Sequence, residues 1–310
     1  MIVAMALPPV LSVLLGASAP WLGRRLPPAT AVRLLTAAML VAALASGFVL
    51  AAAGTLVAGE VPAVAAEGRW SARALAAGLP VPAAVGGLAG LTAGLLLFAA
   101  LRQAVSSARG LVRAARTCRQ LGPDVDGLVV VEDERPDAYA LPGHGGRVVV
   151  STAMLRALPS GERRVLLAHE AAHLAHRHHL WVQTASVAAA ANPLLRPAAR
   201  AVRAGIERWA DEVAAAEVGD RALAARALAR AGLARNGQPP RAGRALALAG
   251  ADGTVADRAR ALLAGPPPRR RVLAGALAAL IVTLSAAVLV TSVDTESRFE
   301  IAESVYAATH

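Results

Sequence analysis

The amino-acid sequence predicts a mainly α-helical membrane protein with four transmembrane helices and one α+β domain that has a small β edge. Of the 310 residues, 56% are hydrophobic and only 17% are charged, and the mean hydropathy of +0.50 is higher than that of a usual soluble fold. Four uncharged apolar stretches each reach the ~20 residues that a helix needs to cross the bilayer core. A more charged segment between the third and fourth stretches holds the residues that can carry chemistry.

The four predicted spans divide the chain. They cover residues 1–22, 34–59, 80–101 and 272–293. The first has the length of a signal peptide, but its arginines, Arg24 and Arg25, follow the apolar core instead of preceding it, so we expect a retained span. The predicted organisation is therefore three spans within residues 1–101, a domain at 102–271, the fourth span, and a short extracytoplasmic tail at 294–310.

The arginines predict the orientation. Residues 102–271 hold 26 arginines and 15 acidic residues, whereas the rest of the chain has 6 of each, so this domain carries the whole net charge of +11. Positive charge stays on the cytoplasmic side, which predicts a cytoplasmic domain and both termini outside the cell membrane. A basic domain beside an anionic leaflet explains the charge, so the lipid bilayer is an expected partner and nucleic acid is not. The single cysteine, Cys118, excludes a disulfide framework and a cysteine-rich zinc site.

The domain begins with β-rich runs at residues 127–131 and 138–150. The second run is interrupted by Pro142-Gly-His-Gly-Gly146, which has the composition of a turn, so a small hairpin or edge sheet is expected. After Pro159 the pattern becomes helical, with Ser160 as the predicted N-cap.

This predicted helix carries His169-Glu170-Ala171-Ala172-His173, which has the pattern HExxH. Side chains four residues apart share a helix face, so both imidazoles can reach one zinc ion. Glu170 can lie beside the remaining coordination position and act as general base on water. The alternative is a helix with a histidine pair on a polar face.

Two residues are candidates for a third ligand. His179 stands ten residues after His169, as in the HExxHxxGxxH pattern, but His176 occupies the glycine position and no methionine follows to form a Met-turn. Glu207 lies on a later amphipathic stretch, and two histidines with a glutamate are a known catalytic zinc set. We therefore expect His169, His173 and Glu207 to bind one zinc ion per chain.

Asp211 follows Glu207 by four residues and shares its helix face. Asp211 either supports the site, by orienting a ligand histidine or moving a proton, or forms a helical salt bridge with Arg208. The apolar stretch at 181–195 is too short to cross the membrane, and a crossing would carry Glu207 to the side opposite His169. We expect it to form a buried or membrane-grazing helix that ends at Asn192-Pro193.

Three more histidines follow the motif. His176 is expected on the ligand face of the helix, whereas His178 is expected to point away from it. Together with His179, they fit the solvation of a helix end better than they fit a ligand set.

Taken in order, the motifs of residues 138–212 resemble those of the BlaR/MecR-type integral-membrane zinc metallopeptidases, in a short actinobacterial-like form without a sensor domain. The motifs are Ala-Tyr-Ala-Leu-Pro, Arg-Val-Val-Val-Ser, a helix ending in HEAAHLAHRHH, Asn-Pro-Leu-Leu and Glu-Arg-Trp-Ala-Asp-Glu. The segment is also similar to the HtpX/Ste24-like membrane proteases. Only 17 residues, 294–310, follow the last span, so a β-lactam sensing role is not expected.

The resemblance implies a zincin-like (gluzincin) domain and a role for each site residue. It makes His169, His173 and Glu207 the zinc ligands, Glu170 the base and Asp211 the supporting acid. It also assigns residues 257–263 to an arginine motif, in which Arg258 polarises the scissile carbonyl or holds the site together. The alternative is a capped helix that starts near Thr254 and leaves Arg258 exposed.

The predicted activity is that of a zinc metalloendopeptidase at the cytoplasmic face of the membrane. A protein or peptide substrate is expected to add a strand beside an edge at Tyr139 or at 148–150. The resemblance implies regulatory proteolysis of a repressor, and HtpX-like quality control of membrane proteins is the alternative. A non-proteolytic, metal-binding membrane scaffold is the alternative from another class.

Overall fold

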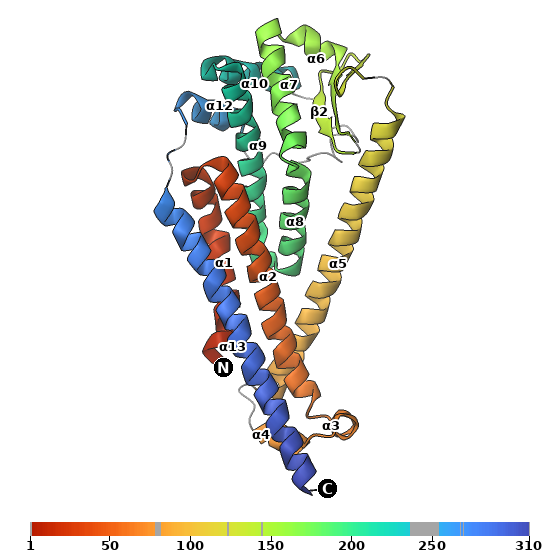
Figure 1. Ribbon diagram of the computed structural model, residues 1–310, viewed down its shortest axis with the longest axis vertical. Helices are drawn as coiled ribbons and strands as arrows, with labels where there is room; N and C mark the ends of the chain where they lie inside the picture. Colours follow the sequence, from red (N-terminus) through yellow and green to blue (C-terminus); the bar gives the residue numbers. More distant parts are fainter. Residues whose placement is uncertain are drawn as a thin grey trace.

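Figure 1 shows the computed structural model, which describes residues 2–77, 82–122, 124–143, 145–235, 254–266, 268 and 270–309. It is an elongated helical bundle with a small sheet at one end. Four of the described helices are long and apolar enough to cross a membrane, as predicted. They are α1 (Ile2–Arg25), α2 (Pro28–Ala58), α5 (Ala83–Gln120) and α13 (Arg271–Thr309).

Two of these helices run well beyond the predicted spans. α5 has 38 residues and α13 has 39, so each is roughly 57 Å long, about twice the thickness of the bilayer core. α5 continues through the arginines from Arg102 to Arg119, and α13 absorbs the predicted tail at 294–309, because neither extension contains a proline. The predicted start of the third span, Pro80, lies outside the described residues.

The connection between α2 and α5 contains two short helices, α3 (Pro62–Gly68) and α4 (Ala72–Ala77). It packs on the far end of α13, where the rings of Trp70 and Phe299 meet edge to face with their centroids 5.1 Å apart. The backbone N–H of Ser71 donates to the Ala302 carbonyl at 2.9 Å. These contacts hold the connection between α3 and α4 against the lower end of α13 (Figure 1).

The sheet has three strands, β1 (Leu128–Val131), β2 (Ala138–Leu141) and β3 (Arg147–Ser151), in the order β1-β3-β2. β2 and β3 form the predicted antiparallel hairpin, and β1 pairs parallel to β3. β3 is thus the central strand with both sides paired, so the prediction of a substrate edge at 148–150 is wrong. β2, which carries Tyr139, is an edge strand.

Two helices follow the sheet, α6 (Thr152–Ala157) and α7 (Ser160–Ala175). A buried cluster that includes Val150, Met154 and Leu166 joins both helices to the sheet. α7 begins at Ser160 with the extended residue Pro159 in the capping position, so the predicted cap is one residue too late. α7 carries the HExxH motif and packs against β2 and β3.

A helical hairpin follows, made of α8 (His178–Ala191), the short η1 (Pro193–Leu195) and α9 (Arg196–Val218). It packs beside α1 and α2 in a large buried cluster, to which α8 contributes Ala185, Ala188 and Ala189 (Figure 1). The stretch predicted at 181–195 thus begins with a partly buried helix that ends at Ala191, directly before Asn192-Pro193. At the turn, the buried Asn192 donates through Nδ2 to the hydroxyls of Ser12 at 2.9 Å and Ser46 at 3.2 Å. These bonds offset the cost of placing a polar turn among apolar helices.

Two further helices complete the upper end, α10 (Arg221–Arg235) and α12 (Val255–Leu263). Thr254 caps α12 by accepting a hydrogen bond from the Asp257 N–H, as predicted. A second buried cluster, with Val165, Ala214 and Leu262 among its members, packs α7, α9 and α12 together. Residues 169–173, 207–211 and 258 therefore face a common centre.

A substitution at Gly16 tests whether the α8–η1–α9 hairpin packs against α1. A Cβ at this position would overlap the carbonyl oxygen of Leu194 in η1, so Gly16→Ala is expected to lower the free energy of unfolding by roughly 1–3 kcal/mol. The measurement is SDS-driven unfolding in mixed micelles. In the control Gly47→Ala on α2, the new Cβ meets no atom of the described residues within 4 Å, so stability should stay equal or rise slightly. Equal stability of both variants would contradict the described packing.

Candidate metal centre

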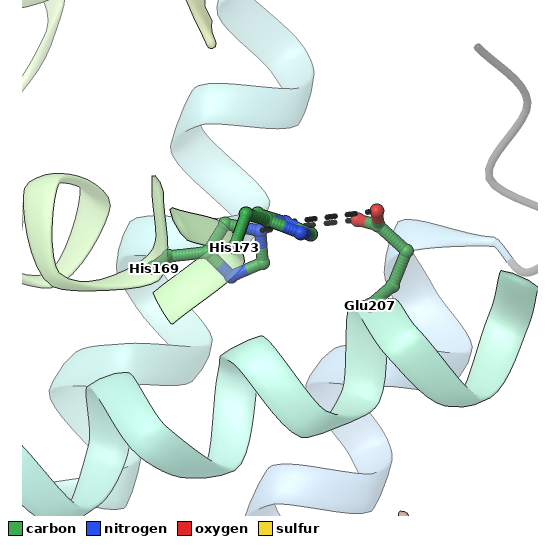
Figure 2. Close-up of side chains that lie close together, drawn as sticks. All are labelled: His169, His173 and Glu207. Atoms are coloured by element: carbon green, nitrogen blue, oxygen red, sulfur yellow. Dashed lines mark hydrogen bonds and ion pairs between the residues drawn. The ribbon is translucent and has the colours of Figure 1, made fainter. Parts of the chain in front are cut away.

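Two imidazoles from α7 and one carboxylate from α9 converge at the centre of the upper half. The Nε2 atoms of His169 and His173 lie 3.2 Å apart. Each Nε2 lies 3.8 Å from an oxygen of Glu207, which faces the two rings in Figure 2. Three atoms that each lie ~2.0–2.1 Å from a tetrahedral zinc ion are separated by roughly 3.3 Å, so the donor set fits zinc with little adjustment.

Local structure explains why these three meet. His169 and His173 are one helical turn apart, and α9 crosses α7 so that Glu207 reaches the same point. His173 is 4% exposed, while His169 and Glu207 are partly open. Among the described residues, these three form the group of histidine, cysteine or carboxylate side chains that could hold a metal ion. His179, the other candidate ligand, is not part of the group.

Asp211 and Arg258 surround this donor set. His169 Nδ1 lies 3.0 Å from Asp211 Oδ1, on the ring side opposite the shared donor atoms. Arg258 donates from Nε and Nη2 to the two oxygens of Asp211 at 2.8 and 2.7 Å, and its Nη1 lies 2.9 Å from Glu207 Oε2. The guanidinium therefore joins both carboxylates, and Asp211 orients His169.

These contacts overturn two alternatives, the helical salt bridge of Asp211 with Arg208 and an exposed Arg258. Arg258 is 9% exposed and faces the site, although α12 is a capped helix as that alternative had it. Arg208 donates to the carbonyl of Gly23 at the end of α1, at 2.8 Å. Asp211 thus pairs with Arg258 and His169, which are distant in sequence, and not with the neighbouring Arg208.

The electrostatics differ between the two histidines. Burial lowers the pKa of His173 well below its usual value, and the positive charge of Arg258 lowers it further. Burial also acts to lower the pKa of His169, but its hydrogen bond to Asp211 and the charge of that carboxylate raise it overall. Although burial opposes ionisation of Asp211, Arg258 and His169 together lower the pKa of its carboxyl. Burial thus favours the neutral form of His173, which is the form that can bind a metal.

Glu170 is buried and follows His169 directly on α7. Its negative charge contributes to the pKa values of both His169 and Arg258, which places its carboxylate near the donor set. A carboxylate close to the donor set can exchange a proton with a molecule at the centre.

Of the three other histidines near the motif, His178 lies differently from the prediction. His176 stacks on the Trp209 ring with centroids 4.7 Å apart, and His179 is one wall of a separate cavity near Gly143. His178 is fully buried, and its Nδ1 lies 2.9 Å from Nδ1 of His173. The prediction that His178 points away from the ligand face is therefore wrong, because α7 and α8 are separate helices.

A cavity of about 860 Å³ opens beside the donor set. Its lining includes Gly23 near the end of α1, Ala204 and Glu207 on α9, and Arg258 on α12. Its volume is sufficient for several side chains of an extended peptide.

A substitution of Arg258 tests whether the buried carboxylates of Asp211 and Glu207 are stabilised by the same guanidinium. In the zinc-free protein, Arg258→Met leaves Asp211 and Glu207 without their shared partner, so the free energy of unfolding should fall by roughly 3–5 kcal/mol. The matched control is Arg260→Met on the same helix, which loses only an exposed pair with Asp257 and should cost less than about 1 kcal/mol. Equal losses in both variants would contradict a buried network at Arg258.

One comparison with known proteins bears on the histidines of this centre. Residues 108–190 match peptidase family M48, and this range contains His169, Glu170 and His173. Neither the comparison with curated proteins nor that with solved structures gives a match. The matched segment covers the end of α5, the sheet, α7 and most of α8. The match covers about a quarter of the chain and supports a zinc-dependent metallopeptidase.

Proposed function

We propose that this chain is a membrane-embedded zinc endopeptidase that hydrolyses peptide bonds at the cytoplasmic face of the cell membrane. The observation that carries the proposal is the convergence of His169, His173 and Glu207 from two crossing helices. The match of residues 108–190 to a peptidase family supports the same conclusion.

His169, His173 and Glu207 would hold the ion. When bound there, zinc supplies a Lewis acid for the scissile carbonyl and lowers the pKa of water. The chain contributes orientation: Asp211 holds the ring of His169 and Arg258 holds the carboxylate of Glu207. Since the guanidinium of Arg258 is engaged with both carboxylates, we assign it to holding the site and not to binding the scissile carbonyl.

Glu170 is proposed as the general base and acid. Its carboxylate accepts the proton of the attacking water and later delivers it to the leaving amine, so that the carboxylate is regenerated. A substrate peptide would add a strand along the edge strand β2, on which Tyr139 lies, with main-chain hydrogen bonds that fix its register.

The surroundings of the centre favour a substrate close to the membrane. Arg208, next to Glu207, donates to the carbonyl of Gly23 at the end of α1. The guanidinium of Arg33 in α2 lies 4.9 Å from the ring centroid of Trp209. Because these contacts are to the ends of candidate spans, the site lies near the headgroup level. We propose membrane-proximal protein segments as the substrate class.

Zinc content tests the ligand set. After purification in detergent under zinc-replete conditions, the wild type should hold about one zinc ion per chain and Glu207→Ala should lose most of it. The control Glu217→Ala changes an exposed glutamate on the same helix and should retain the ion. A full zinc content in Glu207→Ala would show that another residue is the third ligand. A wild type without zinc would contradict the proposed function.

Cleavage tests the role of Glu170. Glu170→Gln should retain zinc but cleave a fluorescently labelled casein roughly 10²–10⁴-fold more slowly, because the amide accepts no proton. Glu134→Gln changes an exposed glutamate near the sheet and should cleave at the wild-type rate. A Glu170→Gln variant that binds zinc and cleaves as fast as the wild type would rule out Glu170 as the base.

A further inference from the structure

His178 is a buried histidine beside the donor set that the proposed chemistry does not use. It is the first residue of α8 and is completely inaccessible to solvent. Its Nδ1 lies 2.9 Å from Nδ1 of His173. The opposite nitrogen of His173, Nε2, is the one that faces His169 and Glu207. His173 is therefore held between the donor set on one side and His178 on the other.

The contact between the two Nδ1 atoms restricts the tautomers of both rings. A neutral imidazole has one N–H and one acceptor nitrogen, so one Nδ1 must donate and the other must accept. His173 can bind a metal through Nε2 only if its proton is on Nδ1. In that state His173 donates, His178 accepts, and the proton of His178 is on Nε2, for which no hydrogen-bond partner exists among the described residues.

A break in the helix brings His178 to this position. In an uninterrupted helix, a residue five positions after His173 would point about 140° away from it. Here Arg177 adopts the left-handed conformation, with φ 50° and ψ 43°, and α8 starts anew after it. The chain therefore turns between the two residues and places the ring of His178 against that of His173.

The ring of His178 is fixed by its neighbours. Its centroid lies 4.8 Å from that of Trp209 and 5.8 Å from that of His176, which itself stacks on Trp209. The other partner of Trp209 is Arg33 from α2. A fixed acceptor is what an oriented ligand needs, because a mobile one would not select a tautomer or a ring angle.

We propose that His178 is a positioning residue that accepts the Nδ1 proton of His173 and thereby fixes the tautomer and the ring orientation with which His173 Nε2 binds the metal. The two ligand histidines then have different supports: a carboxylate, Asp211, for His169 and a neutral imidazole for His173. This inference rests on the metal site of the proposed function.

The zinc dissociation constant, measured by competition with a chromogenic chelator in detergent, tests the proposal. His178→Leu replaces the acceptor imidazole with an apolar side chain of similar size, and should weaken zinc binding by 10–100-fold. His178→Asn places Oδ1 where Nδ1 stands, so its affinity should stay within about threefold of the wild type. The control His179→Leu changes a residue of the separate cavity and should bind zinc as the wild type does.

The outcomes separate this inference from the proposed function. Wild-type affinity in His178→Leu, or equal losses in the Leu and Asn variants, would overturn the role of His178 while leaving the metal site intact. A wild type that binds no zinc would overturn the proposed function itself.

Histidine ¹⁵N NMR of the zinc-loaded wild type gives a second test that needs no variant. Nδ1 should carry the proton in His173, and Nε2 should carry it in His178. Protonated Nδ1 in His178 would contradict the proposal.

Discussion

The buried guanidinium of Arg258 is the interaction on which the upper half of the molecule depends. Asp211 and Glu207 lie on one face of α9, and two carboxylates in apolar surroundings are costly unless a cation compensates them. Arg258 contacts both, and it comes from a different helix, α12. The pairing therefore joins α12 to α9 and, through the bond of Asp211 to His169, to α7. The bonds that pack α12 against α9 and α7 therefore also orient His169, a proposed metal ligand.

The α8–η1–α9 hairpin links this network to the candidate membrane helices. Its polar turn is held by hydroxyls of α1 and α2, through Asn192. Near the middle of α9, Arg208 and Trp209 contact the ends of the same two helices. α9 is thus fixed against the apolar bundle at its start and again beside Glu207, which sets the height of Glu207 relative to the bundle. A site on a rigid element of this kind keeps its geometry better than one on a loop.

Much of the fold follows from local sequence. Length and apolar composition were enough to identify four candidate spans, and the turn at 142–146 was enough for the β2–β3 hairpin. The HExxH spacing places His169 and His173 on one helix face whatever surrounds them, because a residue and the fourth after it are neighbours in any α-helix. The helix ends were less well predicted: α5 and α13 continue because charged residues do not stop a helix where the bilayer ends.

The sequence by itself determined which residue types could hold a metal and which helix carries two of them. Only the tertiary structure decided the rest. The pairing of Asp211 with Arg258 spans 47 positions, and sequence periodicity contains no information on such contacts. β3 became the central strand because β1 pairs with it across a long connection. His178 turned toward His173 because one residue, Arg177, took a left-handed conformation that helical periodicity does not foresee. Local spacing fixes neighbours on one element, whereas contacts between elements depend on how the whole chain packs.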